Sequence, residues 1–238
     1  MQDQQMWLDE VYEHYDVWKG WSADLTSRQD CRLINIELAR AGVPPPARVL
    51  EIGFGTGALL LYLKSLGYDC WGIERRDAHN ENLLRQGVTI RSGEVGTLPH
   101  GYFDLVCVFD VLEHLSKPEI IELLRDINTV LKPGGKLLAR FPNGASPFGA
   151  MIQSGDLTHV STLSISAFSQ ACSVAGLQFI GGWNSAVSWR ADGLARSIAK
   201  PFLLVGRRLT ELFISAVYFG ERRPLDANVT VCAKRRDD

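Results

Sequence analysis

The stretch Arg48-Val-Leu-Glu-Ile-Gly-Phe-Gly-Thr-Gly57 decides the fold of this chain. Its apolar residues predict a short buried strand that runs into glycines at positions 53, 55 and 57. The apolar run 58–66 that follows is compatible with a helix. A strand, a glycine turn and a helix in this order are typical of a nucleotide site in a doubly wound α/β sheet. Glycine suits such a turn because it adopts positive φ and because a Cβ would hold a ligand away from the backbone.

The charges around this loop distinguish two cofactors. Glu74 ends the next predicted strand, about twenty residues after the first glycine, where a carboxylate accepts hydrogen bonds from ribose hydroxyls. The loop also fits the relaxed dinucleotide pattern, so Glu74 alone would suit NAD equally well. Glu51, however, precedes the glycines. Its carboxylate favours a ligand with an ammonium group, as in S-adenosylmethionine, over one with a pyrophosphate, as in NAD.

The composition fits one α/β domain with additions. The chain has 238 residues, 46% of them hydrophobic, which suffices for a core and excludes a disordered protein. A net charge of −2 predicts no nucleic-acid partner. The five cysteines are dispersed and contain no C-x-x-C pair, so neither a zinc site nor a disulfide framework is expected. We expect a cytoplasmic protein with reduced thiols, no signal sequence and no membrane span.

Alternating strands and helices predict a parallel sheet with right-handed crossovers. The domain divides into a helical cap (1–45), a Rossmann-like core (46–182), an insertion (185–224), and a last strand and tail (225–238). The predicted strands are 49–52, 69–73, 88–92, 103–109, 136–141, 177–181 and 229–233, and the predicted helices are 58–66, 77–86, 118–131 and 164–175, after helical runs within 5–41.

Five motifs in order resemble the core of class I S-adenosylmethionine-dependent methyltransferases. They are V-L-E-I-G-F-G-T-G, Glu74, Gly93-Glu94, the D-V-L-E-H run that begins at Asp110, and L-K-P-G-G at 131–135. The resemblance covers about 47 to 236 and implies a Rossmann-like, doubly wound seven-stranded sheet with an antiparallel last strand. Glu94 is a departure, because the family more often has Asp there.

The resemblance also implies where the cofactor binds. Glu51 and the glycine loop would flank the methionine moiety, Glu74 would take the ribose hydroxyls, and Asp110 would lie under the sulfonium. The cofactor-binding residues predicted in this way are Glu51, Gly53, Phe54, Gly55, Gly57, Glu74, Arg75, Gly93, Glu94, Val95, Asp110, Val111 and His114, with Gly93–Val95 at the adenine. S-adenosylhomocysteine would be the product. Gly57 could instead serve only tight helix–strand packing, and Glu113 could be a solvated helix residue.

A hydroxyl acceptor must lose a proton, and a positioned base contributes ~10²–10⁴ in rate. Histidine suits this role because its usual pKa is near neutral. Among the five histidines, His159 lies in a polar loop after the fifth predicted strand, on the acceptor side of this fold. We predict that His159 is the general base and that Asp156 orients it or binds the acceptor. His159 could instead cap the helix that begins near Ser164. We expect no resident metal; the alternative is a metal held by Asp110, Asp156 and His159.

The acceptor is suggested by the segment 141–149 and its continuation 155–159. They are similar to bacterial methyltransferases associated with surface polysaccharide and lipopolysaccharide sugars. This similarity implies O-methylation of a sugar hydroxyl on a glycan of the O-antigen or polysaccharide type. A lipid-soluble small molecule such as a quinone precursor is a second acceptor class, and a non-catalytic cofactor-binding scaffold is a third reading. A dehydrogenase is a more distant fourth.

The insertion is predicted to be an amphipathic helix, with a break allowed at Pro201. Its polar face carries Arg196, Lys200, Arg207, Glu211 and Ser215, and its apolar face carries Leu203, Leu209, Phe213, Ala216 and Val217. Such a helix could make peripheral contact through 195–220 with the inner face of a membrane that carries lipid-linked glycans. The alternatives are packing on the domain and a homodimer.

Overall fold

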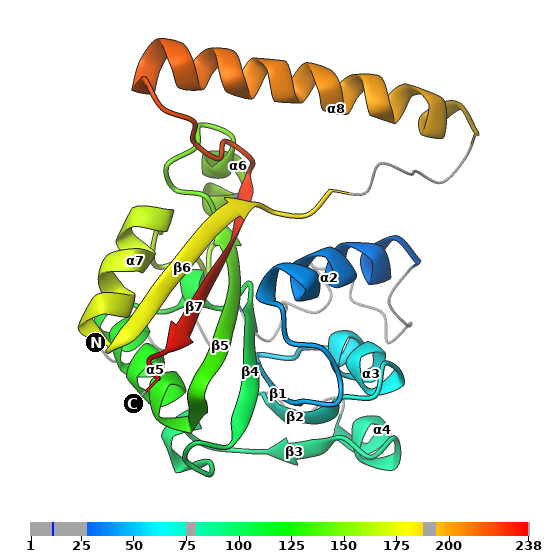
Figure 1. Cartoon of the computed structure of the whole chain (residues 1–238), viewed down its shortest axis with the longest axis vertical. Helices are drawn as coiled ribbons and strands as arrows, with labels where there is room; N and C mark the ends of the chain where they lie inside the picture. The colour runs from blue at the N-terminus through cyan, green and yellow to red at the C-terminus, as the bar shows by residue number, and fades with distance from the viewer. Residues whose placement is uncertain (1–10, 12–27, 75–79, 188–193, 238) are drawn as a thin grey trace.

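The computed structural model describes residues 11, 28–74, 80–187 and 194–237. Its strands form a seven-stranded sheet in the order β3-β2-β1-β4-β5-β7-β6 (Figure 1). The strands are β1 (Arg48–Ile52), β2 (Asp69–Ile73), β3 (Thr89–Arg91), β4 (Phe103–Phe109), β5 (Leu131–Pro142), β6 (Leu177–Asn184) and β7 (Asn228–Arg235). β7 is antiparallel to both of its neighbours and the other pairs are parallel. The predicted fold class is confirmed.

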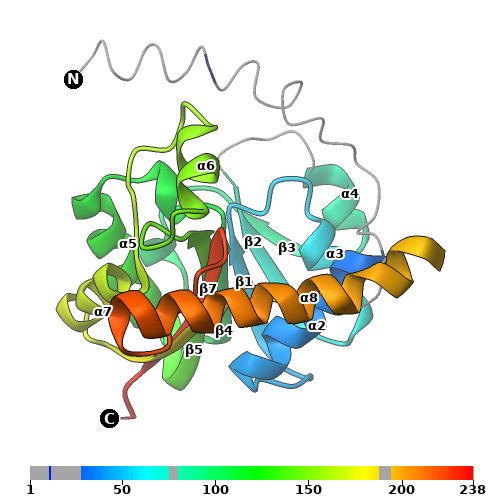
Figure 2. The same cartoon turned by 90° about the horizontal axis from the view of Figure 1, so that it is seen from above.

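Helices cover both faces of the sheet. They are α2 (Arg28–Ala41), α3 (Ala58–Ser65), α4 (Asn80–Arg85), α5 (Lys117–Val130), α6 (Gly149–Ser154), α7 (Ile165–Val174) and α8 (Leu194–Ile214), with short turns η1 (Val95–Thr97), η2 (Leu112–His114) and η3 (Ser215–Phe219). α2, α3 and α4 pack on one face, and α5 and α7 pack on the other (Figure 2). Of the predicted helical cap, the run 32–40 lies within α2, whereas most of 1–27 lies outside the described residues.

The central strands are buried on both faces, which explains their nearly continuous apolar sequence. Along β4, Leu105 and Cys107 belong to the core under α2 and α3, whereas Val106 and Val108 belong to the core under α5 and α7. The order of the strands reverses between β1 and β4. In open α/β sheets, ligands bind at this switch point, outside the carboxyl ends of the strands.

Among the described strands, two boundaries differ from the sequence prediction by three residues or more. β5 begins at Leu131 rather than at 136, because Leu131 already pairs with Phe103 before the register shifts. Gly135 allows this irregularity, since a Cβ there would lie 2.8 Å from the carbonyl oxygen of Lys132. β6 continues to Asn184, three residues beyond the predicted end, because its pairing with β7 continues that far. The short helix α6 was not predicted.

α8 lies across the end of the sheet at which β6 ends (Figures 1 and 2). It runs through Pro201 without interruption, so the allowed break does not occur. A proline inside a helix removes one backbone hydrogen bond and its ring crowds the carbonyl four residues earlier, at a cost of about 3 kcal/mol, which this 21-residue helix tolerates. No helix in the described parts of the chain is long and apolar enough to cross a bilayer.

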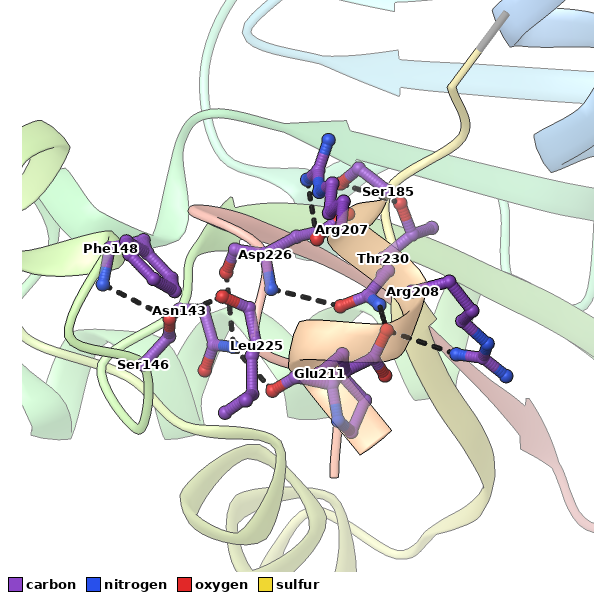
Figure 3. Close-up of polar contacts among 12 residues, drawn as sticks. Asn143, Ser146, Phe148, Ser185, Arg207, Arg208, Glu211, Leu225, Asp226 and Thr230 are labelled. Atoms are coloured by element: carbon purple, nitrogen blue, oxygen red, sulfur yellow. Dashed lines mark hydrogen bonds and ion pairs between the residues drawn. The ribbon is translucent and has the colours of Figure 1, made fainter. Parts of the chain in front are cut away.

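Polar contacts attach α8 to the sheet (Figure 3). Glu211, 7% exposed, accepts hydrogen bonds from Asn184 Nδ2 at 3.0 Å and from Arg208 Nη1 at 2.9 Å. Arg207 forms an ion pair with Asp226, whose backbone N–H donates to Asn184 Oδ1 at 3.0 Å. The polar face of α8 is therefore turned toward the sheet.

The apolar face of α8 is turned toward solvent. Leu203, Leu209, Phe213 and Val217 are 60–69% exposed. On the opposite face, Ser215 is buried like Glu211. Among the described side chains, Glu211 and Ser215 of the predicted polar face are turned inward, and the four apolar residues do not pack on the described part of the domain.

The packing of α7 gives a test of the core. Phe168 is fully buried and lies 5.6 Å, centroid to centroid, from the ring of Phe141. Phe168→Ala should lower the free energy of unfolding by about 3–5 kcal/mol. For a chain of this size the melting temperature should fall by roughly 6–20 °C. The matched control is Val174→Ala on the same helix, where the side chain is 57% exposed and little change is expected. Equal melting temperatures for the two variants would contradict this assignment of the core.

Candidate active site

The glycine loop joins β1 to α3 at the switch point. Gly53, Gly55 and Gly57 all have positive φ, of 71°, 51° and 75°. A Cβ on Gly53 would lie 2.5 Å from Cγ2 of Val111, and the Gly53 N–H donates to the carbonyl of Ile73 at 2.8 Å. The loop is therefore held between the ends of β2 and β4, in a conformation that side chains would strain.

Glu51 lies under this loop as a buried carboxyl group. Burial raises its pKa well above the ordinary value, and the negative charge of Glu74 raises it further. The Oε2 atom of Glu51 accepts no hydrogen bond within the described part of the chain. A cationic ligand group would offset the cost of this buried acceptor. The observation fits the ammonium group of S-adenosylmethionine and does not fit a pyrophosphate.

Glu74 lies at the end of β2, next to the loop. Its Oε2 accepts a hydrogen bond from the Gly55 N–H at 2.7 Å, so the second acid and the glycine turn are in direct contact. Arg75, the following predicted residue, lies outside the described residues.

The proposed adenine segment follows β3. Gly93 has a φ of 102° and no heavy atom within 4 Å of the position of a Cβ, and Glu94 is exposed. Val95 and Phe54, in contrast, point their side chains into the core. Any ligand contact from those two residues would therefore come from their backbone atoms.

Asp110 ends β4 and is paired with Arg140 on β5. The Arg140 Nε donates to Asp110 Oδ1 at 3.1 Å, and a second guanidinium nitrogen donates to Oδ2. Asp110 also has a φ of 56°, in a region that aspartate tolerates better than most residues. Sequence analysis missed Arg140, although a charged residue near the carboxyl end of an apolar strand was a signal for it.

His159 and Asp156 come together in the loop between α6 and α7, as predicted. The His159 side chain is only 4% exposed, and its Nε2 lies 3.7 Å from Asp156 Oδ2. Its Nδ1 lies 3.2 Å from the carbonyl oxygen of Gln153. The alternative role as a helix cap is wrong, because the Ser164 hydroxyl caps α7 by accepting from the Ala167 N–H.

Three further residues lie beside His159 and Asp156: Thr158 of the same loop, and Glu113 and His114 of η2. Thr158 Oγ1 lies 2.6 Å from Asp156 Oδ1 and 2.9 Å from His114 Nδ1. The His114 and His159 rings are 4.9 Å apart. Glu113, which could have been a solvated helix residue, is 2% exposed. His114 contacts Thr158 of the loop between α6 and α7, and its role at the cofactor stays a prediction. Sequence spacing could not reveal these contacts, because they join segments more than forty residues apart.

Glu51 gives a pH-dependent test of this site. The raised pKa means that the folded protein binds the Glu51 proton more tightly than the unfolded chain does. The carboxyl group therefore destabilises the fold progressively as the pH rises from the unfolded pKa through the folded pKa. Glu51→Gln should remove this effect, so its melting temperature should exceed that of the wild type by an amount that grows from pH 4 to neutrality. Each kcal/mol corresponds to about 2–4 °C.

The control for this experiment is Glu81→Gln, at an exposed position on α4. It should show no pH-dependent difference. A Glu51→Gln variant with the wild-type melting temperature at every pH would contradict the conclusion that burial raises the pKa of Glu51.

Comparison with known proteins agrees with the geometry. The family described as a methyltransferase domain matches residues 26–180. A ubiquinone/menaquinone biosynthesis C-methyltransferase from Cupriavidus taiwanensis is 32% identical over 113 residues, which are 42% of this chain and 45% of that relative. A ribosomal protein L11 methyltransferase from Symbiobacterium thermophilum is 33% identical over 104 residues, 41% of this chain and 33% of that relative. The matches thus span less than half the length of these relatives.

Solved structures share the fold at low sequence identity. A SAM-dependent methyltransferase from Archaeoglobus fulgidus has a TM-score of 0.55 and 18% identity, over 94% of this chain and 99% of that one. A 1,6-didemethyltoxoflavin-N1-methyltransferase from Burkholderia thailandensis, solved with S-adenosylhomocysteine, has a TM-score of 0.59 and 15% identity, over 98% and 87%. The chain belongs to the methyltransferase domain family, and its cofactor is S-adenosylmethionine.

Proposed function

We propose that this protein methylates a sugar hydroxyl on a bacterial glycan, with His159 as general base. The observation that carries the proposal is the buried pair of His159 and Asp156 in the loop that follows α6. The Gln153 carbonyl can only accept a hydrogen bond, so His159 Nδ1 is the nitrogen that carries the proton. Its Nε2 then offers a lone pair, and the Asp156 carboxylate beside it would stabilise the imidazolium that forms.

Acidic residues and the glycine loop would hold the cofactor. When bound, S-adenosylmethionine supplies a methyl group on a positively charged sulfur and leaves as S-adenosylhomocysteine. Glu51 would take the ammonium group, Glu74 the ribose hydroxyls, and Gly93–Val95 the adenine. Asp110 and Val111 would lie under the sulfonium. The pairing of Asp110 with Arg140 supports this placement, because it keeps the Asp110 carboxylate at the carboxyl edge of the sheet.

The chain then has two tasks in the transfer. It aligns the acceptor oxygen with the methyl group, and proximity of this kind supplies several kcal/mol of a barrier. His159 Nε2 would take the hydroxyl proton as the acceptor oxygen bonds to the methyl group that the cofactor supplies, with the C–S electron pair left on the sulfur of S-adenosylhomocysteine. The low exposure of His159 keeps bulk water away from the imidazole.

The surface near this edge supports a lipid-linked acceptor. The apolar face of α8 is exposed, and residues 194–223 carry six basic side chains against Glu211 and Glu221. An apolar face with an excess of basic residues suits the surface of an anionic membrane. We therefore propose that the protein works in the cytoplasm at the inner face of the membrane. The buried thiols at positions 70, 107, 172 and 232 suit a reducing compartment.

A cavity of about 410 Å³ lies under α8, and its lining includes Arg40, Arg208, Arg222 and Glu211. The three arginines lie within ion-pair distance of Glu37 or Glu211. A phosphate group of a lipid-linked glycan would therefore have to compete with these carboxylates for the guanidinium groups.

A lipid-soluble small molecule such as a quinone precursor is the second candidate acceptor. The exposed apolar face of α8 favours it as much as it favours a lipid-linked glycan. The similarity to a curated quinone-biosynthesis C-methyltransferase also favours it, although over less than half of either chain. A glycan and a quinone precursor differ in their reacting atoms, so the methylated product distinguishes them.

The catalytic proposal is tested with His159→Ala. The variant should bind S-adenosylmethionine with the wild-type affinity in calorimetry, because Glu51 and Glu74 remain. Its rate of methyl transfer from labelled cofactor to extracted glycans should fall by ~10²–10⁴. His100→Ala, at an exposed position after η1, is the matched control and should keep the full rate.

Several results would contradict the proposal. A full rate for His159→Ala would remove the residue from the mechanism. Labelling of phenolic or quinol lipids instead of glycans would favour the second acceptor. Cofactor binding without transfer to any glycan or phenol by the wild type would indicate a non-catalytic scaffold.

The membrane contact is tested with the double variant Phe202→Ser and Phe213→Ser, at two exposed positions on α8. Burial of an aromatic side chain contributes about 1.5–3 kcal/mol. Each substitution should therefore weaken binding to phosphatidylglycerol vesicles by roughly 10–100-fold in a sedimentation assay. Leu84→Ser, at an exposed position on α4, is the control and should bind like the wild type. If the wild type does not bind vesicles but forms a dimer, and the double variant is monomeric, the membrane proposal is contradicted. The apolar face of α8 would then bind a second copy of this chain.

A further inference from the structure

Three side chains around the catalytic loop form a compact group of metal-ligand type. Glu113 and His114 lie in η2 after β4, and His159 lies in the loop before α7. One ligand atom from each lies within 4.8 Å of the ligand atoms of the other two. Glu113 is 2% exposed and the His159 side chain is 4% exposed, whereas His114 is half-buried, so the group lies at the edge of the core.

The hydrogen bonds determine which nitrogen of each histidine faces this group. His159 Nδ1 contacts the Gln153 carbonyl and must donate, as argued above. Thr158 Oγ1 gives its single proton to the Asp156 carboxylate at 2.6 Å, so it accepts from His114 Nδ1 at 2.9 Å. In both rings the proton is therefore on Nδ1, and the lone pair is on Nε2.

We propose that Glu113, His114 and His159 bind a divalent transition-metal ion through the two Nε2 atoms and the Glu113 carboxylate. Two imidazoles and one carboxylate suit Zn²⁺, Co²⁺ or Mn²⁺ better than Mg²⁺, which prefers oxygen ligands. Metal-bound histidines typically donate their other N–H to a carbonyl or a polar side chain. Gln153 and Thr158 supply such partners. The nearby Asp156 carboxylate adds negative charge that favours the cation.

This set differs from the metal site that the sequence suggested as an alternative. Asp110 was one of its three ligands, but both Asp110 carboxylate oxygens accept hydrogen bonds from the Arg140 guanidinium. Glu113 and His114, three and four residues later, are brought to His159 instead. The expectation of no resident metal stays untested, and the experiments below decide between it and this site.

The inference deepens the proposed function and rests on it only for its catalytic consequence. The ion and the proton compete for the Nε2 of His159. With the ion bound, His159 would be a ligand and not the base, so it would act as general base only in the metal-free protein. The ion would instead lower the pKa of an acceptor hydroxyl that it coordinates. Metal binding itself is independent of the identity of the acceptor.

Co²⁺ titration of the full chain tests the site directly. Protein without a histidine tag, stripped with EDTA and dialysed, should bind one equivalent of Co²⁺ and develop the visible absorption of Co²⁺ with nitrogen ligands. Zn²⁺ should abolish this absorption, and excess Mg²⁺ should not. The melting temperature should rise with Co²⁺ concentration, because the ion binds the folded state.

Three variants locate the ion. His114→Gln should lower the Co²⁺ affinity by at least about 100-fold, more than loss of an outer-shell partner does. Thr158→Val keeps all three ligands and the backbone carbonyl of Thr158, 3.2 Å from His114 Nδ1, but removes the hydroxyl acceptor at 2.9 Å. It should therefore lower the affinity by about 10-fold, the low end of the range for loss of an outer-shell partner. His100→Gln, at an exposed position, should bind Co²⁺ like the wild type. Melting curves in EDTA identify any variant that fails to fold. If either His114→Gln or Thr158→Val fails to fold, the Co²⁺ affinity of the other one tests the site.

The failure of this inference is distinguishable from the failure of the proposed function. If the wild type binds no Co²⁺, or if both variants bind it with wild-type affinity, the metal site is overturned. Methyl transfer to glycans in EDTA would then still support the function. If Co²⁺ binds as expected but no hydroxyl is methylated, the site stands and the proposed function fails.

Discussion

The burial of one carboxyl group, Glu51, is the constraint around which the cofactor site is organised. β1 lies between β2 and β4, so the acids that end these three strands converge on one edge of the sheet. Burial makes the charged form of Glu51 costly, and Glu74 adds repulsion instead of relief. The positive charge of Arg140 and a backbone hydrogen bond from Leu60 oppose these effects, but the side-chain hydrogen bonds of Arg140 go to Asp110. Such an edge favours a cationic nucleoside and disfavours a dinucleotide, which explains why the glycine loop alone did not decide between them.

The acceptor side is joined to the same edge through the backbone. The N–H groups of Val160 and Ser161 donate to the carbonyl of Glu113 at 2.8 and 3.0 Å. These bonds hold the loop that carries Asp156 and His159 against η2, directly after the strand that ends at Asp110. The proposed base and the cofactor edge are therefore fixed to one rigid element, β4. The alignment of acceptor and cofactor then depends on the sheet and not on a separate domain.

Much of this arrangement was predictable from the sequence, because it is built from local patterns that recur along the chain. Apolar strands, glycine turns and strand-end acids are local patterns, and β2 and β4 begin and end where the sequence predicted. The pairings of Arg140 with Asp110 and of His114 with Thr158 were not predictable, because they depend on how distant segments meet in three dimensions. α6 was missed because a six-residue helix is too short to show a hydrophobic period.

α8 shows a different limit of sequence analysis. The sequence divided the helix correctly into two faces, but amphipathicity does not say which face is turned inward. In α8 a single buried acid, Glu211, determines which face is turned inward. Glu211 holds the polar face against the sheet through Asn184 of β6, and turning the helix over would leave that acid without this partner. The apolar face is consequently presented outward, where exposure to water gives no stabilisation. An exposed apolar face of this size is typical of an interaction surface. The helix is therefore best understood as a part of the protein that gains its apolar contacts only when a membrane or another partner covers it.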